Sequence, residues 1–416
     1  MLQSALGIGV ILLIAWLLSE DRRARPSWRW ILGALLLQVA LAVLVLRVPW
    51  IWDALRAGSA GIDVLDNSSR SGSSYIFGYL GGAELPFDLK PGARAPVIIA
   101  FQILPLVIFT SALAALLWHW GVLRLIVRGL SWALQRTLGI GGAVGLNAGA
   151  NVFLGVVEAP LVIRGYLMAM SRAELFMVMT LGMSTVSGVV LVLYSQTLAT
   201  VIDNSFGHII TASLICLPAS ILLARVMVPG ESTTGADPRR DPLRYESSID
   251  AVVRGTMDGL ALFLAVIAIL IVVFALVALA NHVLGVLPDV GGEPVTLQRA
   301  FGWLFAPLMW ALGIPWSEAS DAGALMGTKA ILNEYVAYQQ LASEFADRLS
   351  DRSTLIVIYA MCGFANLASI GLQVATLTTL APERRAEIVS LGFKAWIAGN
   401  LATAMIGAVI GLTTPA

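Results

Sequence analysis

Two glutamates stand within strongly apolar stretches of the sequence, where a carboxylate is costly. Glu158 follows the segment NVFLGVV, and Glu334 follows the segment GTKAILN. A carboxylate at the centre of a lipid bilayer costs at least about 2.5–3.5 kcal/mol unless it is paired or hydrated, so such residues usually face a polar cavity. The alternative is that each makes only a structural hydrogen bond at a hydrated end of its segment. We take both glutamates as the first candidate binding residues.

Neutral oxygen atoms near the first glutamate could bind a hard cation. Asn151, Thr185 and Ser187 offer side-chain oxygens. Sodium takes several such oxygens, together with backbone carbonyls at unwound helix ends. The alternative is helix capping or hydrogen bonding between helices, which is common for Ser, Thr and Asn in membranes. The residues alone leave both interpretations open.

A second polar group follows the second glutamate. Phe364, Asn366 and Ser369 lie between Gly363 and Gly371, which favour a break in a helix. Asn and Ser can hydrogen-bond a polar solute, and Phe can pack against a ring. The alternative is that these residues only pack helices together.

The composition requires a membrane protein. Of 416 residues, 58% are hydrophobic and 12% are charged, whereas soluble domains are about 25% charged. A mean hydropathy of +0.84 over the whole length needs apolar residues that face lipid as well as each other. The formal net charge is zero, so we expect no nucleic-acid partner. The two cysteines and three histidines lack the spacing of a disulfide framework or a metal site.

Eight stretches are long and apolar enough to cross a bilayer, which takes about 20 mostly apolar residues. Positive charges follow the first stretch rather than precede it, so we expect a retained span and not a signal peptide. The predicted spans are 4–19, 30–49, 96–118, 172–200, 205–228, 255–285, 353–380 and 387–412.

Arginine clusters predict the orientation, because cytoplasmic loops carry an excess of Lys and Arg. With the N-terminus outside, eight crossings place all four clusters on the cytoplasmic side. Both chain termini and the polar stretch 50–95 then lie outside. The clusters are Arg22–Arg29, Arg124–Arg136, Arg239–Arg254 and Arg384–Arg385.

Two further apolar stretches, 139–170 and 320–349, are interrupted by polar residues. Irregular backbone at membrane depth is tolerated only inside protein or beside a wet cavity, so we expect two re-entrant helical hairpins. Each hairpin precedes a span with a polar interruption, and such paired segments indicate a weak inverted repeat around a transporter's binding site. Lys329 of the second stretch is expected to be a structural charge partner. Segment 120–137 predicts an amphipathic helix at the cytoplasmic interface.

Four strings resemble the concentrative nucleoside transporter family and occur in its order: 151–161, 327–338, 359–371 and 380–385. The resemblance implies an all-α membrane protein with eight transmembrane helices and two re-entrant hairpins in an inverted-repeat core. It also implies a homotrimer with elevator-type alternating access. We divide the chain into N-terminal scaffold helices 1–119, the interfacial helix 120–137, a first core segment 138–229, a linker with scaffold helix six 230–319, and a second core segment 320–416.

The resemblance also assigns site residues. It implies a ribose site formed by Glu334, Asn366 and Ser369, with Phe364 beside them, and it matches Glu158 to the glutamate of the family's first hairpin. For sodium it implies the side chains of Asn151 and Thr185 and the carbonyls of Leu154 and Val186. Thr185 replaces a usual serine and keeps its hydroxyl.

One departure from the family pattern concerns the base. The first hairpin usually reads Gly-Gln-Thr/Ser-Glu, where the two central side chains meet the nucleobase, but here Val156 and Val157 occupy these positions. Valine offers no side-chain hydrogen bond, and each lost bond is worth about 0.5–1.5 kcal/mol. We therefore expect weaker or altered base selectivity.

The expected function is import of a nucleoside, or a nucleoside-like ribosyl compound, across the inner (plasma) membrane. Sodium is the coupling ion, and no other cofactor is expected. Proton coupling through Glu158 or Glu334 is one alternative, and a different small polar solute is another. An intramembrane enzyme or a receptor is disfavoured, because we find no nucleophile–base pair, cofactor motif or signalling domain.

Overall fold

The computed structural model describes residues 2–24, 26–87, 98–235, 244–290, 292 and 294–414. Within these ranges the fold is helical and contains no β-strand. The first helices are α1 Leu2–Leu17, α2 Trp28–Arg47, α3 Pro49–Phe77, α4 Pro105–His119, α5 Val122–Leu138, α6 Gly142–Asn151, α7 Glu158–Val162, α8 Arg172–Ser184 and α9 Gly188–Leu198. The remaining ones are α10 Ser205–Met227, α11 Ser248–Leu284, α12 Leu297–Leu312, α13 Trp316–Ile331, α14 Glu334–Gln340, α15 Asp351–Met361, α16 Leu367–Leu380 and α17 Arg385–Thr413.

Several helices are apolar enough to cross a membrane. In the described part of the chain, six helical stretches of at least 18 residues have this character. The helices α1 and α16 are also apolar but have 16 and 14 residues. Each of the eight predicted spans contains an apolar helix, so the prediction of a multi-helix membrane protein is confirmed. Arg25, residues 88–97 and the linker residues 236–243, with their predicted arginines, lie outside the described residues.

Two of the predicted spans are broken near the middle. Residues Thr185–Ser187 separate α8 from α9, and residues Cys362–Asn366 separate α15 from α16. The two breaks touch, because the backbone N–H of Phe364 donates to the carbonyl of Thr185 at 3.3 Å. Segments far apart in the sequence therefore meet where both helices are unwound.

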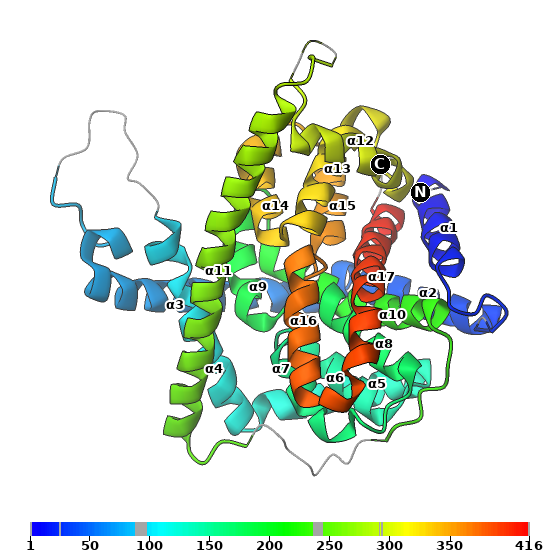
Figure 1. The fold of residues 1–416 in the computed structure, drawn as a ribbon. Coiled ribbons are helices and arrows are strands. Elements are labelled where there is room, and N and C mark those ends of the chain that lie inside the picture. Colours follow the sequence, from blue (N-terminus) through cyan, green and yellow to red (C-terminus); the bar gives the residue numbers. More distant parts are fainter. Residues whose placement is uncertain are drawn as a thin grey trace.

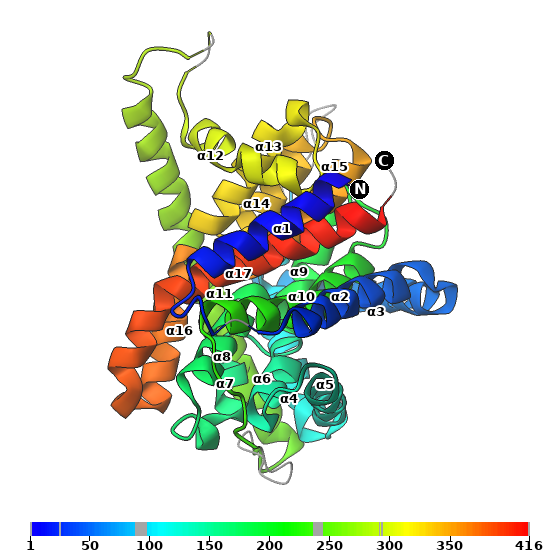
Figure 2. The ribbon, with the colours of Figure 1, turned by 90° about the vertical axis from the view of Figure 1, so that its right-hand side faces the viewer.

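Each predicted hairpin stretch forms helical segments joined by a turn. The first contains α6 and α7, and the second contains α13 and α14, which are separated by Leu332 and Asn333. The pair α13 and α14 lies above the pair α6 and α7 in both views, with α9 between them (Figures 1 and 2).

The predicted amphipathic segment 120–137 forms α5. Glycines on α6 allow α5 to pack closely, since an added Cβ at Gly149 would lie 2.7 Å from the carbonyl of Val127. The opposite face leaves Leu125 and Trp132 exposed at 74% and 70%. Such an exposed apolar face on an arginine-bearing helix is typical of an interfacial helix.

Two helices have no counterpart in the prediction. The helix α3 occupies part of the stretch 50–95, whose many Gly, Ser and Asp residues obscure its helical character. The helix α12 packs against α13, and the contact is so close that an added Cβ at Gly323 would lie 2.6 Å from the carbonyl of Gly302. Small residues permit this approach, which a search for long apolar runs cannot detect.

The helix α17 lies at the centre of the packing. It contacts α1, α8, α10, α15 and α16, and Figure 2 shows it running beside α1 through the middle of the molecule. Glycines on α17 allow these contacts, since an added Cβ at Gly399 would lie 2.6 Å from the Cβ of Met183 on α8. The packing of α17 fixes the positions of the broken helices.

Candidate functional site

The structure brings all seven predicted substrate-binding residues to one cavity of about 220 Å³. The cavity lies between the two hairpins and the two helix breaks, and α11 closes one side. The seven residues are Val156, Val157, Glu158, Glu334, Phe364, Asn366 and Ser369. Residues separated by about half the chain therefore share one small space.

Glu334 occupies the polar side of this cavity and is 3% exposed. It is the first residue of α14, and the side chain of Asn333 caps the helix by accepting from the N–H of Val336 at 2.8 Å. One carboxylate oxygen, Oε1, accepts from the hydroxyl of Tyr194 at 2.5 Å. The other, Oε2, accepts from Nδ2 of Asn366 at 3.2 Å. Hydrogen bonds to both oxygens fix the orientation of the carboxylate.

Asn366 extends this polar row. It caps α16, and its Oδ1 accepts from the N–H of Ser369 at 2.9 Å and from the hydroxyl of Ser369 at 3.0 Å. Its amide nitrogen meanwhile donates to Glu334. The three predicted ribose-binding residues thus form a connected row of donors and acceptors along one wall.

The first hairpin contributes a mostly apolar wall. Val156 is 6% exposed, Val157 next to it is half-buried, and Glu158 is the first residue of α7. A Cβ at Gly155 would lie 2.5 Å from Oε2 of Glu158, so a larger residue at this position would require the carboxylate to move. Beyond Glu158, the side chains on this wall offer no polar group.

The predicted sodium ligands lie where the first hairpin meets the first break. The N–H of Gly188 donates to the carbonyl of Phe153 at 3.2 Å and ties the hairpin turn to the break. Asn151 and Thr185 are both 2% exposed. The Nδ2 of Asn151 donates to the carbonyl of Asn147 at 3.0 Å, and the hydroxyl of Thr185 donates to the carbonyl of Leu181 at 2.8 Å.

The oxygen atoms at this place suit a hard monovalent cation as ligands. The two side-chain oxygens remain acceptors after their own donors are used. The carbonyls of Leu154 and Val186 lie outside the helices, in the turn between α6 and α7 and in the first break. Within the described residues, no cluster of three His, Cys, Asp or Glu could hold a transition metal. Neutral oxygens at unwound helices are typical of sodium sites.

Among the cavity-lining residues that sequence reasoning missed are Tyr194 and a wall formed by α11. Tyr194 of α9 binds Glu334, yet it stands 140 positions away at the end of the apolar run 188–194. The wall is formed by α11, whose residues Leu262, Val266 and Leu270 line the cavity. No local pattern distinguishes these side chains from others that face lipid.

Lys329, the predicted charge partner, makes its direct bonds to neutral groups, while Glu334 of the same hairpin acts on it through its charge without a direct ion pair. Its ammonium group donates to Oδ1 of Asn400 at 2.8 Å and to the hydroxyl of Thr403 at 3.1 Å, and both partners are neutral. No ion pair joins Lys329 to a carboxylate in the part of the chain that the structure describes.

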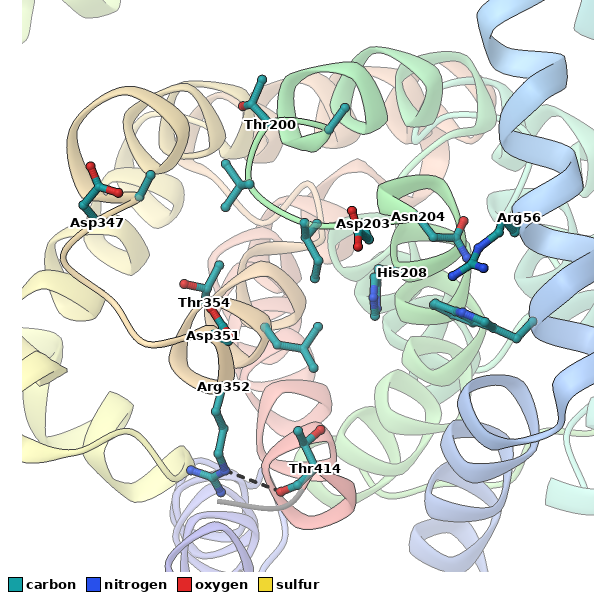
Figure 3. Close-up of a pocket in the computed structure, with 16 residues that line it drawn as sticks. Arg56, Thr200, Asp203, Asn204, His208, Asp347, Asp351, Arg352, Thr354 and Thr414 are labelled. Carbon is teal, nitrogen blue, oxygen red and sulfur yellow. Dashed lines mark hydrogen bonds between the residues drawn. The ribbon is translucent and has the colours of Figure 1, made fainter.

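A larger cavity of about 880 Å³ contains none of the predicted site residues. Figure 3 shows it between the loops around Asp203 and Asp347, with Arg56 on another side and Arg352 linked to Thr414. Arg352 also donates to the carbonyls of Gly313 and Gly411, so backbone oxygens already occupy its guanidinium group. We therefore assign the candidate site to the smaller cavity.

Family models match three parts of the chain. Residues 6–80 match the "Na+ dependent nucleoside transporter N-terminus" and residues 208–411 match the "Na+ dependent nucleoside transporter C-terminus". Residues 100–201 match a model described as "Gate: Nucleoside recognition". Together these matches cover both hairpins and both breaks.

Known proteins match over nearly the whole length. The nucleoside permease NupC of Helicobacter pylori is 34% identical over 98% of this chain and 97% of its own, and the putative nucleoside permease NupX of Escherichia coli is 32% identical over 99% and 98%. Among solved structures, CNTnw in an inward-facing substrate-bound state has a TM-score of 0.87 with 38% identity, over 100% of this chain and 99% of that one. An intermediate state of a CNTnw variant has a TM-score of 0.90, over the same shares of the two chains.

Proposed function

Because the chain belongs to the sodium-dependent nucleoside transporter family, whose members are transporters rather than enzymes, we propose that it imports a nucleoside or nucleoside-like ribosyl compound in symport with sodium. It is a multi-pass membrane protein, and we place it in the inner (plasma) membrane with eight crossings and both termini outside. The solute and the ion bind near the middle of the transport core, between the two hairpins.

The row formed by Glu334, Asn366 and Ser369 is the observation that carries this proposal. A ribose presents neighbouring hydroxyls, each of which can donate and accept a hydrogen bond. A fixed carboxylate next to an amide and a hydroxyl matches this pattern, and hydrogen bonds to a charged group are the stronger ones. The ring of Phe364 at the same cavity gives the sugar or base an apolar surface.

Sodium acts through the first hairpin. An ion held by Asn151, Thr185 and the two carbonyls orders the hairpin turn, and the nucleoside then bridges both halves of the core. A ligand drives a conformational cycle only if it binds the two facing states with different affinity. An elevator-type movement of the core segments 138–229 and 320–416 against the scaffold supplies these states.

The scaffold offers a surface for the expected homotrimer. The helix α11 runs along one side of the molecule next to α4 (Figure 1) and leaves large apolar side chains exposed, such as Ile271 at 66% and Leu279 at 60%. Lipid and neighbouring subunits are the partners that such a surface accepts.

The valine pair shapes the base side of the site. Val156 and Val157 present methyl groups where the family usually has hydrogen-bonding side chains, so the base is held by contact area rather than by polar groups. This favours solutes with a less polar base. A different small polar solute is the second candidate, and the same two valines support it.

Uptake into proteoliposomes tests the proposal. We expect labelled uridine or adenosine to accumulate under an inward sodium gradient and not when choline replaces sodium. Asn366→Ala should abolish this uptake, whereas Asn67→Ala on the exposed part of α3 should leave it unchanged. Accumulation driven only by a proton gradient would establish proton coupling instead. If no ribosylated compound accumulates under either gradient, the proposal fails.

A further inference from the structure

The two side chains that we assign to sodium stand at the ends of two neighbouring helices. Asn151 is the last residue of α6, and Thr185 directly follows α8. The two helices pack against each other. Their first turns also lie side by side, since a Cβ at Gly141 would lie 2.8 Å from Oε1 of Glu174. The separation of the two ligands therefore depends on how the helices are held together where they begin.

Glu174 lies in this contact and is 1% exposed. It stands in the first turn of α8 and forms a capping box with Ser171, in which Oε2 of Glu174 accepts from the N–H of Ser171 at 2.9 Å. A buried carboxylate is costly unless hydrogen bonds satisfy both of its oxygens. The cap alone serves one oxygen, so Glu174 needs donors from outside its own helix.

A segment that follows α10, residues 231–234, supplies these donors. Oε1 of Glu174 accepts from the N–H of Thr234 at 2.8 Å and from the hydroxyl of Ser232 at 3.2 Å. Oε2 accepts from the hydroxyl of Thr234 at 2.6 Å. Both carboxylate oxygens are therefore bound to this segment, and hydrogen bonds to a charged group are the stronger ones.

The same segment also holds the beginning of α6. The N–H of Gly141 donates to the hydroxyl of Ser232 at 2.9 Å. The N–H of Ala143 donates to the carbonyl of Thr234 at 3.1 Å. The segment thus joins the first turns of α6 and α8, and Glu174 is the charged group on which its bonds converge.

We propose that Glu174 is a positioning residue for the sodium site. By fixing the segment 231–234 across the beginnings of α6 and α8, it sets the separation of Asn151 and Thr185 at their ends, as partners behind a metal ligand orient that ligand. This inference rests on the proposed sodium-coupled transport, and it concerns a residue assigned to neither the ion nor the solute. It also assigns the segment 231–234 to the moving core, which the sequence-based division ends at residue 229.

Glu174→Gln tests this role, because it keeps the size of the side chain but replaces one oxygen by an NH2 group. That group would face the N–H of either Thr234 or Ser171, and a backbone donor cannot turn away. We expect the sodium concentration for half-maximal uptake to rise roughly tenfold. The maximal rate at saturating sodium should stay within about twofold of wild type. Stabilisation of the purified variant against heat should likewise need more sodium.

A milder pair of variants decides the question if Glu174→Gln does not fold. Thr234→Val removes one donor to the carboxylate and should raise the same sodium concentration about threefold or more. Thr234→Ser keeps the hydroxyl and should behave as wild type. Glu231→Gln is the matched control in the same segment, because Glu231 joins the network through its backbone carbonyl, which accepts from the hydroxyl of Ser171 at 2.9 Å.

A lower maximal rate with unchanged sodium dependence in Glu174→Gln and Thr234→Val would show a merely structural contact and overturn the inference. An equal rise in the sodium requirement of Glu231→Gln would overturn it too. If neither the uptake nor the thermal stability of the wild type responds to sodium, the proposed function itself is contradicted, and this inference falls with it.

Discussion

The hydroxyl of Tyr194 donates a 2.5 Å hydrogen bond to Oε1 of Glu334. Tyr194 belongs to α9, directly after the first break, whereas Glu334 begins the second helix of the second hairpin. Both side chains line the small cavity. This bond therefore joins the two halves of the transport core at the carboxylate that we assign to the ribose.

Tyr194→Phe removes this donor and keeps the ring. Oε1 of Glu334 loses a fixed partner, and a hydrogen bond to a charged group is worth about 1.5–3 kcal/mol. We expect the KM for nucleoside uptake to rise about tenfold or more, with a smaller change in the maximal rate.

Tyr335→Phe is the matched control for this change. Its ring lines the same cavity, but its hydroxyl accepts from Gln339 at 2.9 Å and does not bind Glu334. An equal rise in KM for both variants would show that the Tyr194 bond has no special role.

Thr185→Val should weaken sodium binding. The substitution keeps the shape of the side chain and removes the oxygen that we assign to the ion. We expect the sodium concentration for half-maximal uptake to rise roughly tenfold, because the sodium ion loses one of its oxygen ligands. Thr180→Val in α8, the helix that ends just before Thr185, is the control, because its buried hydroxyl has no hydrogen-bond partner among the described residues. Equal sodium dependence of Thr185→Val and wild type would remove Thr185 from the ion site.

The double variant Val156→Gln, Val157→Thr should restore polar contacts to the base. Each new hydrogen bond is worth about 0.5–1.5 kcal/mol, so uridine or adenosine should bind roughly five- to 100-fold more tightly. Competition by free ribose, which lacks a base, serves as the internal control and should not change. Unchanged uptake of both nucleosides would refute the assignment of the valine wall to the base.

An acid-sensitive contact lies at Glu20, in the loop after α1. Its carboxylate is 2.8 Å from Arg172 and 3.0 Å from Lys394. The hydrogen bond from Arg172, supported by Lys394, lowers the pKa of Glu20 from 4.5 to about 2. Because the folded-state pKa is depressed, the stabilisation is complete above pH 4.5 and is lost as the pH falls toward 2.

Thermal unfolding of Glu20→Gln between pH 3 and 7 measures this contribution. We expect the variant to be less stable than wild type by at most about 1 kcal/mol near pH 7, since the pair is partly exposed. The difference should shrink below pH 4.5. The exposed Glu344→Gln is the control, and a pH-independent difference for Glu20→Gln would contradict the ion-pair explanation.

Much of the architecture could be predicted from local sequence properties. Apolar length identified the membrane helices, and polar residues within apolar runs identified the hairpins and both breaks. Val156, Glu334 and Asn366 meet at one cavity because each stands at such an interruption. A polar residue at membrane depth needs a polar environment, and this requirement is visible in the sequence.

Features that depend on distant partners could not be predicted in this way. The partner of Tyr194 is 140 positions away, and the partners of Lys329 are 71 and 74 positions away on α17. A buried lysine suggests a direct carboxylate partner, but the hydrogen bonds of Lys329 go to two neutral oxygens. The helices α3 and α12 were missed for other reasons, since α3 is only weakly apolar and α12 has 16 residues, fewer than a membrane crossing takes.

The hydrogen bond from the N–H of Phe364 to the carbonyl of Thr185 has a thermodynamic consequence. We assign the ion to Thr185 and the solute to Phe364, so this hydrogen bond couples sodium binding to nucleoside binding. Linkage is reciprocal, so the factor by which sodium tightens nucleoside binding is also the factor by which the nucleoside tightens sodium binding. A cell that keeps its internal sodium low thereby loosens the nucleoside on its own side of the membrane.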